Sequence, residues 1–157
     1  MTNSREPSDP GFEQRVRDSF GRQRLMATLG AGLVRVSAGE VEIEMPFADH
    51  LTQQHGYLHA GVVTALVDSA CGYSALSLAP SGTEVLTVEY KVNFLAPARG
   101  DRFVARGRVL RSGRTVTVCS GDVVALVGAQ ATPVAAMLAT IITVSASSAA
   151  GAATDRA

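Results

Sequence analysis

The pattern of apolar and polar residues changes its period along the chain, and each period predicts a different element. From Leu33, the segment LVRVSAGEVEIEMPF alternates apolar and polar residues on both sides of SAGE. Alternation with a period of two is typical of a strand with one buried face, and SAGE supplies a turn, so we predict a β-hairpin. The same alternation returns in EVLTVEYKVNFL, DRFVARGRVLR, RTVTVCSGDVVALV and TPVAAMLATIITV. The linkers APARG, SGR and GAQAT are too short for parallel crossovers, so the predicted strands are antiparallel.

One long segment breaks this alternation. After His59, the run AGVVTALVDSACGYSALSLA is rich in Ala and Leu and ends at PSG, which predicts a long helix. Because this helix is apolar on nearly every side, it needs burial on every side. A five- or six-stranded antiparallel sheet wrapped around one long central helix would provide that burial, so the predicted fold class is α+β.

The remaining segments lie at the two ends of the chain. Phe12, Val16, Phe20 and Leu25 recur at loosely helical intervals that Gly21 interrupts, which predicts a short helix and a loop before the hairpin. Residues 1–11 combine prolines with mixed charge, and residues 146–157 are rich in Ala and Ser, so we predict that both ends are disordered. One domain, residues 12–145, is left between them.

Composition and charge narrow the classes of function. The chain has 157 residues and equal numbers, 14 each, of basic and acidic side chains. No overall charge therefore favours nucleic acid or an anionic membrane. No apolar stretch is long enough to span a bilayer, and the N-terminus is too charged for a signal peptide, so we predict a cytoplasmic protein. Cys71 and Cys119 lack metal-ligand or CxxC spacing, which favours two reduced, buried thiols and no metal site.

Asp68 is the one charged residue in the predicted central helix. At helical spacing it shares a face with small residues, namely Gly61, Thr64, Ala65, Cys71, Gly72 and Ala75. One interpretation is that Asp68 caps a second helix beginning at SACGYSAL. However, nothing at ALVDSA breaks a helix, and a buried carboxylate costs several kcal/mol unless it is paired or protonated. Because no structural role for this buried carboxylate is evident in the sequence, its presence indicates a chemical role.

The start of the same helix carries complementary groups. His59 precedes the first turn, where free N–H groups and the positive end of the helix dipole can hold a developing oxyanion. Ala60 and Asp68 are separated by roughly 12 Å of helix, which is too far for both to act on one carbonyl. Two antiparallel copies related by a two-fold axis would bring one chain's helix start near the other's Asp68, so we predict a homodimer with two shared sites.

At this point the sequence resembles a known family. HGYLHAGVVTALVDSACGYSA, LTVEYKVNFLAPARGD and SGRTVTV are similar to the hotdog-fold acyl-CoA thioesterases of the phenylacetate-degradation (PaaI-like) type, over roughly residues 29–144. The family carries an HGG-type turn followed nine residues later by Asp or Glu, and His59 and Asp68 stand at that spacing. The resemblance implies hydrolysis of an acyl-CoA without metal or cofactor, since coenzyme A is part of the substrate. It also implies dimers that pair into a tetramer.

The resemblance also assigns roles to individual residues. Asp68 would be the nucleophile or general base, and the backbone N–H of Ala60 would polarise the thioester carbonyl. His59 belongs to the same turn, and Gln53 stands where the family places an assisting Asn or Gln. Thr87 falls where relatives position the attacking water, although a plain strand residue is an equal reading. This chain has HAG in place of HGG, and a helical backbone tolerates the added methyl group.

Further residues are expected to hold the substrate. Arg111 and Arg114 flank the SG turn where relatives present basic side chains to the phosphates of coenzyme A, and the alternative is a solvated hairpin. Phe94 packs either on pantetheine or in the core, and Gly61 lies in the turn that meets the thioester.

The acyl group stays open among aryl, aryl-acetyl and medium-chain groups. A hotdog-fold hydratase or dehydratase and a non-catalytic acyl-CoA binding module are the alternative functions.

Overall fold

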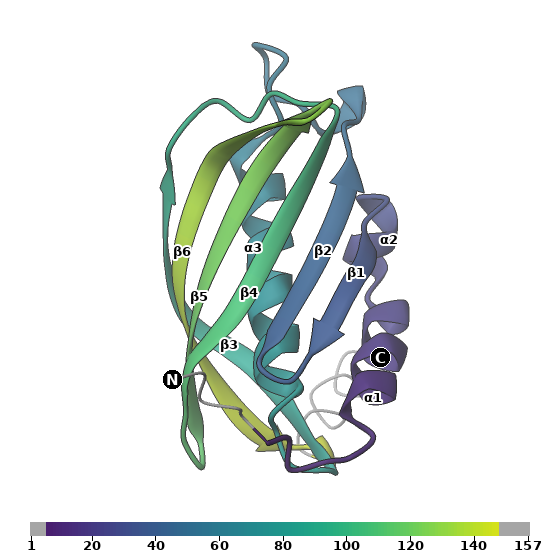
Figure 1. The fold of residues 1–157 in the computed structure, drawn as a ribbon, viewed down its shortest axis with the longest axis vertical. Coiled ribbons are helices and arrows are strands. Elements are labelled where there is room, and N and C mark those ends of the chain that lie inside the picture. Colours follow the sequence, from purple (N-terminus) through teal and green to yellow (C-terminus); the bar gives the residue numbers. More distant parts are fainter. Residues whose placement is uncertain (1–5, 148–157) are drawn as a thin grey trace, which may run out of the picture.

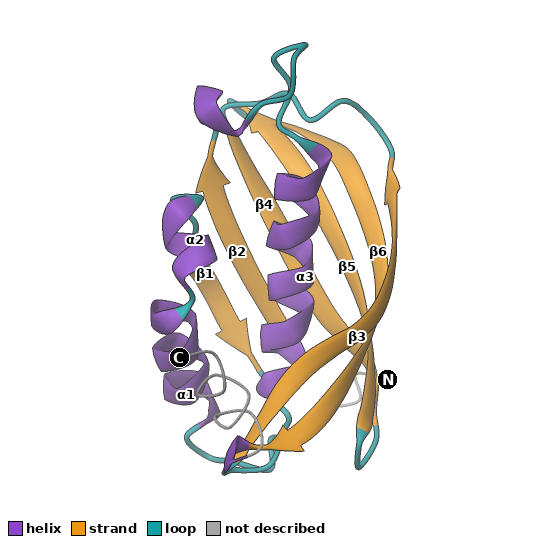
Figure 2. Ribbon diagram, turned by 180° about the vertical axis from the view of Figure 1, so that it is seen from behind, coloured by secondary structure: helices purple, strands orange, loops and turns teal. Residues whose placement is uncertain are grey.

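The six strands form one antiparallel sheet. The computed structural model describes residues 6–147. The strand order is β1-β2-β4-β5-β6-β3, and each neighbouring pair is antiparallel. The strands are β1 (Gly32–Ser37), β2 (Glu40–Pro46), β3 (Thr83–Phe94), β4 (Arg102–Ser112), β5 (Val116–Val127) and β6 (Gln130–Ser145). Figures 1 and 2 show this sheet curving around a single helix, so the predicted α+β architecture and its hairpin are confirmed.

The central helix, α3 (Ala60–Leu76), lies along one face of the sheet, as Figure 2 shows. The sheet can approach it closely because β4 and β5 each place a glycine beneath it. A Cβ atom at Gly107 would lie 2.2 Å from the backbone oxygen of Ala70, and one at Gly121 would lie 2.5 Å from Cγ2 of Val67. The helix backbone therefore rests directly on the sheet at Gly107, and the side chains of Val67 and Cys71 pack over Gly121.

Two shorter helices precede the sheet. They are α1 (Phe12–Arg22) and α2 (Arg24–Thr28); both lie beside β1, and α1 also packs against α3 (Figure 1). The chain passes through Gly21 in helical conformation and breaks at Gln23, where ψ is 98°. The predicted helix is thus two helices rather than a helix and a loop. Arg15 of α1 donates hydrogen bonds to the carbonyl oxygens of Leu76, Ala79 and Pro80, which satisfies the end of α3.

Strand β3 forms an edge of the sheet and has exposed apolar side chains. It pairs with β6 along one side, and β6 is its only neighbour among the strands of residues 6–147. Leu86, Val88, Tyr90 and Phe94 are 51%, 54%, 45% and 49% exposed. A long edge strand with apolar side chains is a ready template for pairing with another chain.

The structure also bears on the predicted cysteines, membrane segments and chain ends. Cys71 and Cys119 are both buried, as predicted, and Cys119 Sγ donates a hydrogen bond to the Cys71 carbonyl oxygen at 3.6 Å. Within residues 6–147 no helix is both long and apolar enough to cross a membrane. The predicted disorder of the chain ends concerns, at residues 1–5 and 148–157, positions outside the described part of the chain. Inside the predicted N-terminal segment, Asp9 forms an ion pair with Arg15 at 3.3 Å.

Candidate active site

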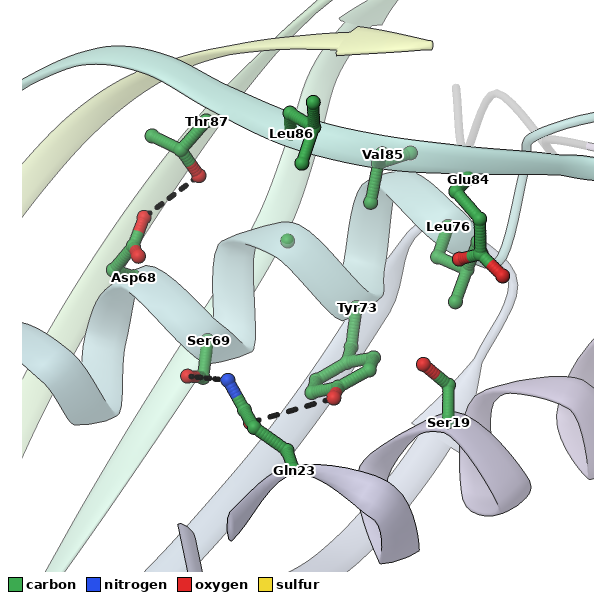
Figure 3. Close-up of a pocket in the computed structure, with 11 residues that line it drawn as sticks. Ser19, Gln23, Asp68, Ser69, Tyr73, Leu76, Glu84, Val85, Leu86 and Thr87 are labelled. Carbon is green, nitrogen blue, oxygen red and sulfur yellow. Dashed lines mark hydrogen bonds between the residues drawn. The ribbon is translucent and has the colours of Figure 1, made fainter. Parts of the chain in front are cut away.

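Asp68 lies in the middle of α3 and faces β3. Thr87 Oγ1 donates a hydrogen bond to Asp68 Oδ1 at 2.9 Å, and both side chains line a cavity of about 390 Å³ between the helix and the strand (Figure 3). A β-bulge follows Thr87, because the register with β6 shifts between Thr87 and Glu89. Bulges re-aim side chains, and this one occurs directly beside the contact with the carboxylate. Strand β3 therefore runs beside the helix, with Thr87 directed at Asp68.

Burial raises the pKa of Asp68, and the hydrogen bond from Thr87 opposes that rise. No Lys, Arg or His lines the cavity, and Asp68 forms no ion pair within residues 6–147. The carboxylate is thus half-buried without a cation to stabilise its charge. A carboxylate with a raised pKa is a stronger base than one in water, which suits proton abstraction or attack on a carbonyl.

The alternative role for Asp68, as the cap of a second helix, is wrong. Helix α3 continues without a break from Ala60 to Leu76, so Asp68 lies inside it. The small-residue face also needs correction. Cys71 and Ala75 are buried on the core side, whereas Gly72 lines the cavity together with Asp68. Small side chains do not reveal by themselves which way they point, and the predicted face was therefore too wide.

The first turn of α3 leaves one backbone amide unused. His59 is the N-cap residue, and its Nδ1 accepts a hydrogen bond from the Gly61 N–H at 2.8 Å. The N–H groups of Val62 and Val63 both bond to the His59 carbonyl oxygen. Among residues 6–147, the Ala60 N–H has no acceptor, and Ala60 is exposed. One donor at the positive end of the helix is therefore available to a ligand, and His59 holds the turn that presents it.

A second cavity, of about 260 Å³, surrounds this amide. Gln53, Ala60 and Phe94 line it together. The Gln53 side-chain oxygen accepts a hydrogen bond from the His55 N–H, which fixes the side chain. Its amide nitrogen has no acceptor within the described chain, so it remains available as a second donor. Ala60 itself is helical, and the only positive φ angles in residues 6–147 belong to glycines, so the methyl group causes no strain.

The two cavities have no lining residue in common on one chain. Ala60 and Asp68 are eight residues apart on an unbroken helix, a separation of roughly 12 Å along its axis. One chain therefore supplies a carboxylate at one place and the amide donors at another.

The remaining sequence candidates are distributed differently. Arg111 and Arg114 are exposed at the hairpin between β4 and β5, at the end of the molecule where α3 ends, and neither lines a cavity that contains Asp68 or Ala60. Their role stays a prediction. The Gly61 N–H is used by His59, so Gly61 offers its small size rather than its amide. Within residues 6–147 no three His, Cys, Asp or Glu side chains come together in a way that could hold a metal ion.

Sequence reasoning missed the polar wall opposite Asp68. Gln23, at the break between α1 and α2, donates a hydrogen bond to Ser69 Oγ and accepts one from the Tyr73 hydroxyl, both at 3.3 Å. Figure 3 shows Gln23 between these two side chains, with Ser19 on the same side of the cavity. No periodic signal marks Gln23, because its place depends on how α1 packs against α3.

Comparison with known proteins agrees with this fold. The sequence pattern of the thioesterase superfamily matches residues 55–132, a range that includes Ala60, Asp68 and Thr87. The crystal structure of a thioesterase family protein from Silicibacter pomeroyi is 50% identical, covers 86% of this chain and 99% of its own, and superposes with a TM-score of 0.85. The PaaI protein from the phenylacetic acid degradation operon of E. coli has a TM-score of 0.77 at 20% identity, over 85% of this chain and 93% of its own.

Human acyl-coenzyme A thioesterase 13 is 31% identical over 91 residues, which is 57% of this chain and 64% of that protein. The chain likewise spans 64% of the length of a protein from Saccharolobus solfataricus that is named as an esterase, to which it is 33% identical over 90 residues. An antiparallel sheet wrapped around one central helix defines a hotdog-fold protein. The chain belongs to the thioesterase superfamily.

Proposed function

We propose that this protein hydrolyses acyl-CoA thioesters at sites shared between two chains. The observation that carries the proposal is that one helix bears both a candidate base and an unused hydrogen-bond donor. Asp68 is a half-buried carboxylate with a raised pKa and no cation, and Ala60 offers an unused amide donor at the positive end of the same helix. A base and an oxyanion donor are the two groups that acyl transfer to water requires.

The exposed surface of β3 supports the dimer. An edge strand of 12 residues with four apolar side chains about half exposed would be covered by the same strand of a second copy. A two-fold axis there would be self-complementary and would run α3 of one chain antiparallel to α3 of the other. The Ala60 amide of each protomer would then lie near Asp68 of the partner subunit. Two such dimers would pair again into a tetramer.

In this arrangement the substrate carbonyl lies at the Ala60 N–H, with the Gln53 amide nitrogen as a second donor. Asp68 either draws a proton from water as the water oxygen attacks the carbonyl carbon, or attacks that carbon itself. In both routes negative charge develops on the carbonyl oxygen, where the two donors stabilise it. The C–S bond then breaks and the sulfur leaves, taking up a proton from the water molecule to become the coenzyme A thiol. In the first route the acyl group leaves at once as the carboxylic acid; in the second it stays on Asp68 as a mixed anhydride until a water molecule hydrolyses it, which frees the acid and regenerates the carboxylate.

Thr87 holds Asp68 through the 2.9 Å hydrogen bond, so it is a positioning residue for the carboxylate. The same hydroxyl can accept a hydrogen bond from the attacking water, because its own proton is donated to Asp68. His59 positions the amide in a comparable way, since its ring accepts the Gly61 N–H and thereby fixes the turn that precedes Ala60.

The acyl group would occupy the cavity of about 390 Å³ beside Asp68. Leu76, Val85 and Leu86 give this cavity an apolar side, and Gln23 and Tyr73 give it a polar side. An aromatic ring can pack on the apolar side of this cavity and meet the polar groups at its edge. We therefore propose aryl and aryl-acetyl groups as better substrates than a medium aliphatic chain. The name of the human relative, an acyl-coenzyme A thioesterase, supports a coenzyme A thioester as the substrate class.

A hydratase or dehydratase is the second candidate, and the structure offers less for it. Proton transfer at a double bond needs a His and a carboxylate acting together. No histidine lines either cavity, and the His59 Nδ1 is already bonded to Gly61. A non-catalytic acyl-CoA binding module would bind the same ligand without turnover.

One assay separates these functions. A panel of acyl-CoAs that includes benzoyl, phenylacetyl, hexanoyl and crotonyl thioesters would be incubated with the protein, while a thiol reagent follows free coenzyme A. We expect thiol release with a preference for the ring-bearing substrates. Hydration of crotonyl-CoA without thiol release would identify a hydratase, and tight binding without either reaction would identify a binding module.

A further inference from the structure

A third cavity adjoins the one that contains Ala60. It has a volume of about 350 Å³ and is lined by Arg99, Val127, Gln130 and Thr132 together with residues of the Ala60 cavity. The two cavities share Tyr57, Ala96 and Pro97. The two cavities therefore adjoin at these three residues, and we call the two together the groove, with the Ala60 N–H at one end and Arg99 at the other.

The charge of this groove is concentrated at its far end. Of all the residues that line the two cavities, Arg99 alone is charged. Its guanidinium carbon lies 5.5 Å from the centroid of the Tyr57 ring, a distance at which a cation is attracted to the aromatic face. Arg99 is exposed and forms no ion pair within residues 6–147. Its positive charge is thus held in place and is available to an anion.

Other arginines near the sheet are already paired. Arg35, Arg102, Arg106 and Arg108 each form ion pairs with carboxylates on neighbouring strands. Arg111 and Arg114 line neither part of the groove. Arg99 is therefore the cation placed to meet a ligand whose other end lies at Ala60.

The position of Arg99 relative to Ala60 is fixed by the backbone. The Leu58 N–H donates a hydrogen bond to the Ala98 carbonyl oxygen at 3.1 Å, which ties the loop after β3 to the segment that leads into α3. Leu58 is two residues before Ala60, and Ala98 is next to Arg99. A single backbone contact thus sets the distance from the amide donor to the guanidinium.

We propose that Arg99, supported by the ring of Tyr57, binds a phosphate of the nucleotide end of coenzyme A. This inference rests on the proposed function. A thioester with its carbonyl at Ala60 would lay its pantetheine arm across Ala96 and Pro97, which present little that could hinder an extended chain. The anionic end of the ligand would then reach the one cation of the groove, where a guanidinium can bond a phosphate through two N–H groups. Gln130 and Thr132 add neutral hydrogen-bonding groups at the same end.

The test compares two substrates that differ only at the nucleotide end. Arg99→Ala would be assayed with an acyl-CoA and with the same acyl group on pantetheine. We expect kcat/KM for the acyl-CoA to fall roughly 10- to 100-fold, as the loss of a charge-assisted hydrogen bond predicts, mainly through KM. Turnover of the pantetheine thioester should not change, because its contacts with the protein do not include Arg99. Arg99→Lys should recover part of the loss, since it restores the charge without the planar fork.

The double variant Arg111→Ala, Arg114→Ala is the competing test, because the sequence predicts that these two arginines hold the phosphates, whereas they lie outside the groove. We expect it to affect the acyl-CoA much less than Arg99→Ala does. Equal losses with both substrates in Arg99→Ala, no loss with either, or a larger loss in the double variant would overturn the assignment. Calorimetric titration with coenzyme A alone tests the site without turnover. A weaker Kd in Arg99→Ala than in the native protein supports the assignment even if no thioester is hydrolysed, and an unchanged Kd overturns it.

Discussion

Thr87 and Asp68 meet between β3 and α3, where the threonine hydroxyl donates a 2.9 Å hydrogen bond to Oδ1 of the carboxylate. The second oxygen, Oδ2, has no donor among residues 6–147, and Asp68 lines the cavity beside Leu86 and Tyr73. One oxygen thus anchors the carboxylate, and the other is available to a substrate or a water molecule. Burial and this single anchor act in opposite directions on the pKa of Asp68, and burial is the larger effect.

Replacement of Thr87 tests the anchor. Thr87→Val preserves the shape of the side chain and removes the hydrogen-bond donor. Because that bond lowers the pKa of Asp68, its loss should raise the pKa further and move the acidic limb of the kcat/KM profile to higher pH. We also expect kcat to fall by about tenfold, because the carboxylate loses a hydrogen bond that stabilises its charge and orientation. Thr87→Ser, which keeps the hydroxyl, should behave like the native protein, and a Val variant with an unchanged profile would remove Thr87 from the site.

The pH profile of the native protein follows from the same pKa. Hydrolysis needs the ionised carboxylate, so kcat/KM falls as the pH drops through the pKa of Asp68. Since burial raises that pKa, the acidic limb should lie above the range of an ordinary carboxyl group. The measurement is kcat/KM for one acyl-CoA across acidic pH, with a stability control at each value. A flat profile down to the ordinary carboxyl range would contradict the role of Asp68 as the titrating group.

The close approach of helix and sheet predicts a stability effect far from the chemistry. Gly107→Ala would place a Cβ atom 2.2 Å from the Ala70 carbonyl oxygen, a contact that only backbone movement can relieve. Overpacking of this kind costs about 1–3 kcal/mol or more in free energy of unfolding. Denaturant titration would measure the loss. Gly21→Ala is the control, because nothing lies within 4 Å of its added methyl group and α1 should become slightly more stable.

The fold could be predicted from the sequence because its elements have distinct periods. The strands alternate with a period of two, and α3 interrupts them with a run too apolar and too long for an exposed strand. The position of Asp68 inside that helix also followed from the absence of a helix breaker at ALVDSA. Thr87 was singled out through the resemblance to the thioesterase family, and its contact with Asp68 depends on how β3 packs beside α3.

Other parts of the site leave no trace in the sequence pattern. Gln23 reaches Tyr73 only because α1 ends where it does and packs on α3, which is a tertiary contact between segments far apart in the chain. Arg99 is one of several arginines in exposed segments, and its distinction comes from the cavities around it rather than from its neighbours in sequence. Cys71 was placed on the wrong side of α3, because small residues occur both on the core side and beside the cavity.

Mixing two inactive variants tests whether the site is shared. Ala60→Pro removes the amide donor at the first helical position, where proline is well tolerated, and His59 already has the extended ψ of 138° that proline requires of its predecessor. Combined with Asp68→Asn after reversible dissociation, it should give heterodimers with one intact site each. Random pairing would restore about a quarter of the native activity. Ala60→Gly, which keeps the amide, should be active alone, and a mixture with no recovery would contradict the shared site.

The most direct test of the account is the rate of coenzyme A release by Asp68→Asn. Asparagine keeps the volume of the side chain and its hydrogen-bond acceptor for Thr87, but it cannot act as a base or form the same covalent intermediate. We expect kcat to fall at least roughly 100-fold, with little change in KM. The melting temperature at neutral pH should not fall, because the native protein bears the cost of an ionised, half-buried carboxylate and the variant does not. Wild-type turnover in Asp68→Asn would contradict the catalytic role of this residue and, with it, the proposed mechanism.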